Sequence, residues 1–174
     1  MAIVPEDSAV RSPRVRVAMA AAATAVVVAD QVSKTLVLAS HPLAGTGWAA
    51  VRLVRNSGAS GGIGAGYPLL VTLAAVVIAG LAATLAVRSR GRAVADCLAA
   101  VLGGALGNLS DRVFRSPGFG RGAVVDWIHL GWSGGSFNMA DMAIQIGVVG
   151  AVIAMIASER AQKAGQPREH VNPG

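Results

Sequence analysis

The sequence has few of the charged residues with which a soluble protein covers its surface. Charged residues make up 14% of the 174 residues, whereas a typical soluble domain carries about 25%. Hydrophobic residues make up 53%, and this fraction excludes intrinsic disorder, because chains stay unfolded when hydrophobicity is low and charge is high. The length allows one modest domain, and the composition favours an integral membrane protein.

Cysteine, histidine and aromatic residues are also scarce. The single cysteine, Cys97, excludes an internal disulfide framework and a cysteine-rich zinc site, and the three scattered histidines argue against a histidine metal cluster. The net charge of +6 is compatible with nucleic acid or a membrane surface as partner. Aromatic residues amount to only 4% and the arginines are dispersed, so we expect no nucleic-acid partner and attribute the basic excess to membrane topology.

Four apolar segments are long enough to cross a bilayer, whose hydrocarbon core of about 30 Å requires roughly 20 apolar residues per helix. The segments cover residues 17–39, 67–87, 93–113 and 137–158. Long loops separate the first segment from the second and the third from the fourth, whereas a short arginine turn joins the second to the third. The sequence therefore predicts an all-α integral membrane protein with four transmembrane helices.

Basic residues are distributed unevenly between the two sides of this predicted bundle. Nine lie on the side of the chain termini: Arg11, Arg14, Arg16, Arg88, Arg90, Arg92, Arg160, Lys163 and Arg168. Five lie on the side of the long loops: Arg52, Arg55, Arg112, Arg115 and Arg121. The positive-inside rule predicts that both termini are cytoplasmic, with tails at residues 1–14 and 161–174 and a four-helix membrane domain at 15–160.

The first segment has a second possible interpretation. Basic residues followed by the apolar run 17–29 resemble a secretory signal peptide, with Val27-Val28-Ala29 as a candidate cleavage site. The apolar character resumes beyond Asp30 and makes the segment long enough to span a bilayer, so we interpret it as a retained helix.

Polar residues gather at the outer ends of these segments. Ionisable side chains within a membrane-spanning segment are energetically costly, so each such residue needs a structural or functional explanation. The three groups are Asp30 with Lys34, then Asn108, Asp111 and Arg112, and finally Asn138 with Asp141. Each group alone has a structural interpretation: an i, i+4 ion pair, a hydrogen-bond cluster at a helix end, and an N-cap with an acidic N3 residue. Because all three lie at one depth beside the long loops, together they indicate a site near the outer leaflet.

A further carboxylate, Asp126, lies in the second long loop within the apolar stretch 122–128. Its β-branched and aromatic neighbours predict a short strand, in which Asp126 could simply be a strand-terminal aspartate. With Asp141 it forms a carboxylate pair that lacks a basic residue nearby in the sequence, unlike the carboxylates of the other two groups. Two such carboxylates can share a proton, so that one acts as base for a water and the other as acid for a leaving group.

Two other functional classes remain open on this reasoning. A small ion-coupled carrier would also place charged residues within a helix, but its polar residues should spread through the membrane midplane. A non-catalytic assembly protein would use Gly103 and Gly107, which have the spacing of a helix-packing pair. Such a protein would tolerate the loss of Asp126 or Asp141.

Five sequence blocks occur in an order that resembles one known family. They are Asp30-Gln31-Val32-Ser33-Lys34, Arg55-Asn56-Ser57-Gly58-Ala59, Gly103-Gly104-Ala105-Leu106-Gly107-Asn108-Leu109-Ser110-Asp111-Arg112, Val124-Val125-Asp126-Trp127 and Phe137-Asn138-Met139-Ala140-Asp141. Over about residues 14 to 160 the chain is similar to lipoprotein signal peptidase (signal peptidase II), a bacterial inner-membrane aspartic peptidase with four helices. The last three blocks are highly specific in combination.

The resemblance implies a membrane aspartic endopeptidase that removes signal peptides from prolipoproteins by cleaving before the diacylglyceryl-modified cysteine. It implies that Asp126 and Asp141 are the catalytic pair and that the first long loop forms a small extracytoplasmic β-cradle for the substrate. No metal or organic cofactor is implied. The expected location is the bacterial plasma (inner) membrane, where a multi-pass monomer, surrounded by membrane lipids, presents its active site on the extracytoplasmic side.

The resemblance also implies a set of substrate-binding or supporting residues. They are Asn56, Asn108, Asp111, Arg112, Asn138, Asp30 and Lys34. We expect Asn108 and Asn138 to orient carboxylates or substrate carbonyls. Arg112 is expected to hold the substrate backbone or Asp111, and Asn56 to position the first loop.

Three features depart from the usual pattern of that family. Ala59 is followed by Ser60-Gly61-Gly62, where the family usually has an aromatic residue. Trp127 stands in place of a phenylalanine, and the stretch 115–122 is longer than usual. These departures bear on substrate preference and on the loop, and they leave the expected chemistry intact.

Overall fold

The structure, a computed structural model, describes residues 12–40, 49–131 and 135–164, and the predicted tails lie largely outside these ranges. Four helices are long and apolar enough to cross a membrane: α1 (Pro13–Ser40), α2 (Pro68–Arg88), α3 (Arg92–Phe114) and α4 (Met139–Ala164). The short elements are the strands β1 (Ala49–Asn56), β2 (Val124–Leu130) and β3 (Ser136–Phe137) and the 3-10 turn η2 (Ser60–Gly62). The predicted fold class, four membrane helices with a small β-structure, is confirmed.

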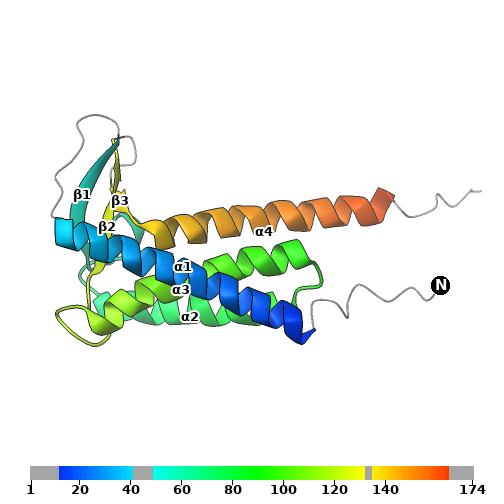
Figure 1. Cartoon of the computed structure of the whole chain (residues 1–174), viewed down its shortest axis with the longest axis horizontal. Helices are drawn as coiled ribbons and strands as arrows, with labels where there is room; N and C mark the ends of the chain where they lie inside the picture. The colour runs from blue at the N-terminus through cyan, green and yellow to red at the C-terminus, as the bar shows by residue number, and fades with distance from the viewer. Residues whose placement is uncertain (1–11, 41–48, 132–134, 165–174) are drawn as a thin grey trace, which may run out of the picture.

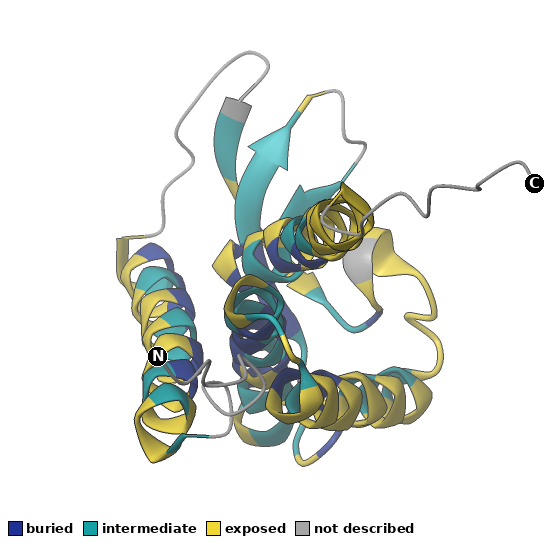
Figure 2. Cartoon of the chain, turned by 90° about the vertical axis from the view of Figure 1, so that its right-hand side faces the viewer, coloured by how far each residue is buried: buried dark blue, intermediate teal, exposed yellow. Residues whose placement is uncertain are grey.

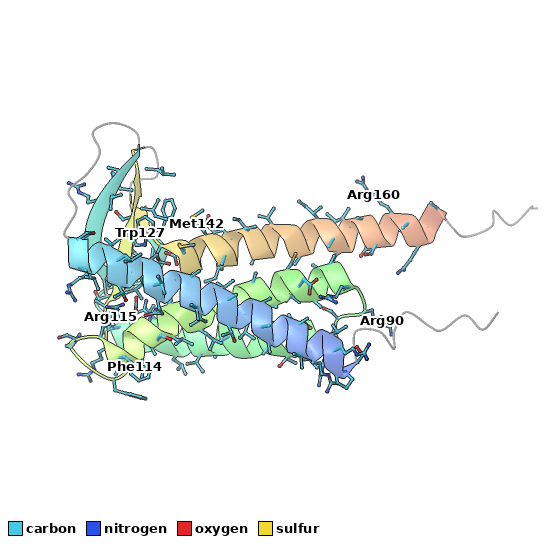
Figure 3. All side chains as sticks on the ribbon, in the orientation of Figure 1. Arg90, Phe114, Arg115, Trp127, Met142 and Arg160 are labelled. Carbon is cyan, nitrogen blue, oxygen red and sulfur yellow. The ribbon has the colours of Figure 1, made fainter. Side chains whose placement is uncertain are left out.

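The helices run side by side along the long axis of the molecule, and the sheet lies at one end of the bundle (Figure 1). Helix α1 begins and α4 ends at the opposite end, where the turn from α2 to α3 also lies. Arg90 and Arg160 are at that far end, whereas Arg115 and Trp127 are at the end with the sheet (Figure 3). The two ends of the described chain therefore lie at the same end of the bundle, and their cytoplasmic location remains a prediction.

Helix α3 is the centre of the bundle, because it packs against each of the other three helices. Glycines permit this close approach. A Cβ added to Gly103 would lie 2.6 Å from the carbonyl oxygen of Ala23 in α1, and one added to Gly107 would lie 2.8 Å from a carboxylate oxygen of Asp30. The predicted role of this glycine pair in helix packing agrees with these contacts.

The bundle is apolar outside and partly polar inside, as a lipid environment requires. Large side chains such as Leu36, Leu73 and Ile146 are well exposed, whereas the buried apolar residues are mostly alanines. The most deeply buried polar residues are Asp30, Lys34, Asp111, Asp126 and Asn138, each at most 1% exposed. Figure 2 shows the buried residues on the inward faces of the helices.

The sheet combines both long loops, in the order β1-β2-β3 with antiparallel pairing. The first loop supplies β1, as the resemblance implied, and the second loop completes the sheet with β2 and β3. The predicted strand around Asp126 is present as β2, where Asp126 lies opposite Val54 of β1. Pairing requires partners far apart in the sequence, which is why local pattern identified β2 but not its neighbours.

Candidate active site

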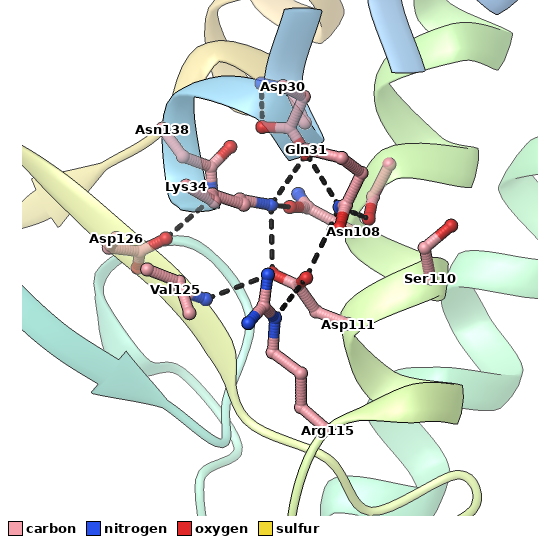
Figure 4. A network of polar contacts seen from close by, with 12 residues as sticks. Asp30, Gln31, Lys34, Asn108, Ser110, Asp111, Arg115, Val125, Asp126 and Asn138 are labelled. Carbon is pink, nitrogen blue, oxygen red and sulfur yellow. Dashed lines mark hydrogen bonds and ion pairs between the residues drawn. The ribbon is translucent and has the colours of Figure 1, made fainter. Parts of the chain in front are cut away.

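The site lies where the sheet meets the outer ends of α1, α3 and α4 (Figure 4). The structure brings all nine site residues predicted from the sequence into one connected region. They are Asp30, Lys34, Asn56, Asn108, Asp111, Arg112, Asp126, Asn138 and Asp141. They come from three helices and two strands or strand ends. None of the described groups of His, Cys, Asp and Glu has three or more members arranged to hold a metal ion.

Asp126 is held at the end of β2 by two asparagine amides. The Nδ2 of Asn138 donates to its Oδ1 at 2.6 Å, and the Nδ2 of Asn56 donates to its Oδ2 at 2.9 Å. Burial raises the pKa of Asp126 to about 6, and the charge of Asp141 acts in the same direction against the lowering effects of the two amides and of Lys34. A carboxyl group with this pKa can hold and release a proton near neutral pH.

Asp141 occupies the first turn of α4, where it forms a capping box with Asn138. The Oδ1 of Asn138 accepts from the backbone N–H of Asp141 at 2.9 Å, and an Asp141 oxygen accepts from the backbone N–H of Asn138 at 3.3 Å. The Nδ2 of Asn108 donates to its other oxygen at 2.8 Å. These donors fix both oxygens of the carboxylate at the start of α4.

Two asparagines link the carboxylates of Asp126 and Asp141. Asn138 donates to Asp126 at 2.6 Å and also approaches the Oδ1 of Asn108 at 3.2 Å, while Asn108 donates to Asp141 at 2.8 Å. Each amide therefore has a defined orientation, with its nitrogen toward a carboxylate. The expectation that these residues orient carboxylates agrees with this arrangement.

A cluster of four charged side chains lies behind the asparagines. Lys34, which is fully buried, contacts Asp30 at 2.7 Å, Asp111 at 2.9 Å and the Oδ1 of Asn108 at 3.1 Å. Arg115 contacts Asp111 at 2.6 Å. The cluster thus holds two carboxylates and two cations, and its formal charge is zero.

Asp111 and Arg112, which the sequence suggested as a couple, point to different partners. Asp111 pairs with Lys34 and Arg115 and accepts the backbone N–H of Val125 at 3.0 Å. Arg112 instead donates to backbone carbonyls of the β1–η2 turn, at 2.6 Å to Gly58 and 3.4 Å to Ser57. Of the two expected partners of Arg112, Asp111 was wrong, because adjacent residues on a helix leave the axis about 100° apart.

Asn56 orders the same turn, as expected, and also contacts the site. Its Oδ1 accepts the N–H of Gly58 at 2.9 Å, and its Nδ2 donates to the carbonyl of Ala59 at 3.0 Å as well as to Asp126. A Cβ on Gly58 would lie 2.6 Å from backbone atoms of Gly62 and Ile63. Only glycine fits this position without displacing the turn.

A cavity of about 500 Å³ opens beside the carboxylates. Its polar end is formed by Asp126, Asp141, Asn56, Asn108 and Arg112. Most of the remaining wall is apolar, and its longest stretch follows α2, through Tyr67, Leu70, Val71, Ala74, Ala75 and Ile78. From Leu70 to Ile78 this wall is about 12 Å long at 1.5 Å per residue, so the cavity joins an apolar channel to two acidic side chains.

Sequence reasoning missed Arg115 of the charge cluster and Gln31, which donates to it. The Nε2 of Gln31 donates to the carbonyl of Gly107 at 3.0 Å and approaches Asp111 at 3.2 Å. Gln31 was visible as a polar residue beside Asp30 in an apolar segment. Arg115 lies four residues after Asp111, which is the spacing of a helical ion pair, and this signal could have identified it.

Four membrane-length helices that enclose a buried polar site beside an apolar cavity define a multi-pass membrane enzyme. The signal peptidase II family model matches residues 22–157, and the chain belongs to that family. This membership confirms the predicted function, the removal of signal peptides from prolipoproteins by a membrane peptidase.

Individual relatives agree with this assignment. A lipoprotein signal peptidase of Bifidobacterium longum subsp. infantis is 38% identical over 84% of this chain and 82% of its own length. One from Leifsonia xyli is also 38% identical, over 74% of this chain, but the match spans only 62% of that relative. The fold resembles a solved bacterial membrane enzyme with a TM-score of 0.70, at 23% identity, covering 89% of this chain and 94% of the other.

Proposed function

We propose that this chain is an aspartic endopeptidase that cleaves prolipoproteins before the diacylglyceryl-modified cysteine, with Asp126 and Asp141 as its acid–base pair. The observation that carries the proposal is the position of these two carboxylates at the polar end of one largely apolar cavity. The curated relatives are named lipoprotein signal peptidases, which supports prolipoproteins as the substrates.

The surroundings of the two carboxylates favour different roles. Asp126, with a pKa of about 6, holds the shared proton. Asp141 receives hydrogen bonds from the side chain of Asn108 and from the backbone N–H of Asn138, and it acts as the base. This division places an acid and a base on one cavity, as hydrolysis through a water molecule requires.

The reaction then needs only one water and the two carboxyl groups. Asp141 takes a proton from the water while the hydroxide oxygen bonds to the carbonyl carbon before the modified cysteine. Asp126 gives its proton to the amide nitrogen as the carbon–nitrogen bond breaks. The proton held by Asp141 restores the shared proton of the pair, so that the net reaction consumes one water.

The supporting residues fix the positions of this pair. Asn56, Asn108 and Asn138 hold the carboxylates by hydrogen bonds. The cluster of Asp30, Lys34 and Asp111 lies behind them, and Lys34 orients the amide of Asn108. Arg112 holds the β1–η2 turn through the Gly58 carbonyl, and its Nε, buried and without a partner among the described residues, can donate to a substrate carbonyl.

The apolar wall along α2 is suited to hydrocarbon. Its residues Leu70, Val71 and Ile78 would contact the signal helix or the acyl chains of the substrate, because both must lie in the bilayer while the scissile bond reaches the interface. In this arrangement the enzyme works as a monomer among membrane lipids. The excess of basic residues at the other end of the bundle supports an extracytoplasmic position of the sheet and the active site, in a bacterial plasma membrane.

The test is cleavage of a diacylglyceryl-modified precursor in detergent by Asp126→Asn, Asp141→Asn and the double variant. Loss of a general acid or base costs about 10²–10⁴ in rate, and because the pair acts as a unit the double variant should be scarcely worse than either single one. Asp96→Asn is the matched control, since Asp96 is half-exposed and paired with Arg92 at the far end of α3. Retention of more than about a tenth of wild-type turnover by either single variant would refute the aspartic mechanism.

A further inference from the structure

A second cavity, of about 410 Å³, adjoins the sheet. It is more polar than the first cavity, with walls from β1, the turn that follows it, and the strands β2 and β3. Its lining includes Arg52 and Arg55 from β1 and His129 from β2. The proposed mechanism uses none of these three side chains.

Asp126 is a point at which the two cavities meet. Asp126 is 1% exposed, yet together with Asn56 it borders both the first cavity and the second. A polypeptide that passes over Asp126 with an apolar portion in the first cavity would therefore continue into the second. This geometry gives the two cavities different parts of one substrate.

The charge around the second cavity is strongly one-sided. In the two long loops, residues 41–66 and 115–138, Asp126 is the only acidic residue, against four arginines. Arg115 is paired with Asp111, whereas no carboxylate of the described residues forms an ion pair with Arg52 or Arg55. Both arginine side chains are exposed, so they can meet a ligand without first leaving a partner.

We infer that the second cavity binds the polypeptide that follows the modified cysteine, and that Arg52 and Arg55 make the enzyme prefer acidic residues in this segment. The inference rests on the proposed function, since it assigns the part of the substrate beyond the scissile bond. The spacing fits an extended chain: Arg55 is adjacent to Asn56, which contacts Asp126, and Arg52 lies roughly 10 Å further along β1 at about 3.3 Å per residue. The two arginines thus face the first few residues after the cysteine.

The expected selectivity is modest, because exposed charges are screened by water and salt. Attraction of acidic residues and repulsion of basic ones act together, so we expect kcat/KM to be about tenfold higher with aspartates than with lysines after the cysteine. The difference should shrink as the ionic strength rises from about 0.05 M to 0.5 M, since the screening length falls to a few ångströms.

The experiment uses the full chain in zwitterionic detergent and three diacylglyceryl-modified precursors. The precursors differ only in carrying Asp, Ser or Lys at the three positions after the modified cysteine. Wild type should cleave them in the order Asp, Ser, Lys, and the variant with both Arg52→Gln and Arg55→Gln should cleave all three within about threefold of one another. Arg121→Gln is the control, because Arg121 is an exposed arginine of the same end that lines neither cavity, and it should keep the wild-type order.

Equal kcat/KM for the three precursors with wild type would overturn the inference, as would an unchanged order in the double arginine variant. Lipid headgroups are the other possible source of negative charge, and they are tested by repeating the assay in nanodiscs with and without anionic lipid. If the double arginine variant differs from wild type only with anionic lipid, and equally for all three precursors, the arginines bind lipid headgroups. That result would also overturn the inference. Failure of the proposed function looks different, since the serine precursor would then remain uncleaved by wild type or be cleaved equally well by Asp126→Asn.

Discussion

Replacement of Lys34 by methionine should strongly destabilise the outer end of the bundle. Lys34 is fully buried and contacts Asp30, Asp111 and Asn108 within 3.1 Å. The variant leaves two buried carboxylates with only Arg115 to balance them. Breaking a buried pair by removing one partner costs about 3–5 kcal/mol, and we expect the free energy of unfolding to fall by this amount.

A second substitution tests whether charge balance is the cause. Adding Asp30→Asn to Lys34→Met restores a neutral cluster, in which Asp111 keeps Arg115 at 2.6 Å. The double variant should therefore recover about 1–3 kcal/mol relative to Lys34→Met alone, a coupling typical of residues in direct contact. Asp30→Asn by itself should fold less stably yet still turn over substrate, because Asp30 supports the site without touching the reacting atoms.

The assay is unfolding in detergent with increasing dodecyl sulfate, followed by tryptophan fluorescence. Arg92→Met provides the matched control, since Arg92 and Asp96 form an i, i+4 pair of the same spacing that is about half exposed and should contribute less than about 1 kcal/mol. If Lys34→Met loses no more stability than Arg92→Met, or if the double variant is less stable than Lys34→Met, the argument from a neutral buried cluster fails.

The remaining predictions concern pH, the β1–η2 turn, metals and topology. Because Asp126 loses its proton as the pH rises through about 6, kcat/KM should follow a bell whose alkaline limb begins near pH 6 and belongs to the carboxylate pair; constant activity from pH 5 to 8 would contradict this. Gly58→Ala should lower kcat/KM about 10- to 100-fold by displacing the turn, whereas Gly66→Ala, with no atom within 4 Å of an added Cβ, should act like wild type. Incubation with a chelator should leave precursor cleavage unchanged, and recovery of lost activity by an added divalent cation would be the contrary result. Reporter fusions after Arg90 and after Gly120 should read cytoplasmic and extracytoplasmic respectively, and the reverse pattern would invert the proposed location of the site.

The helices were the part of the fold most accessible from sequence. Apolar length alone placed the third span at residues 93–113, and the helix runs from Arg92 to Phe114. Helix α4 extends to Ala164, beyond the predicted end at residue 158, because its last turns carry polar residues that hydropathy excludes. Apolar length is a local property, and that is why it can be read from one sequence.

The candidate site was accessible where its signal was local. The capping box of Asn138 and Asp141 has i, i+3 spacing, and the Asp30–Lys34 pair has i, i+4 spacing, so both could be expected. The contact between Lys34 and Asp111 joins residues 77 positions apart. Helical or strand periodicity in a sequence predicts contacts only between residues a few positions apart. The same limit hid the hydrogen bond from Asn56 to Asp126, which depends on the pairing of β1 with β2.

Asp30 accepts the backbone N–H of Ala140 at 3.0 Å and so caps α4 from a neighbouring helix. In a chain that is made from its N-terminus, the buried charges of α1 and α3 are already present before this last helix arrives. Asp30 and Asn108 already share Lys34 as a partner, and their contacts with Ala140 and Asp141 form only when α4 enters the bilayer. Insertion of the final helix therefore adds hydrogen bonds to polar groups inside the membrane and also delivers Asp141. A chain whose synthesis stops before α4 would thus lack one member of the proposed catalytic pair.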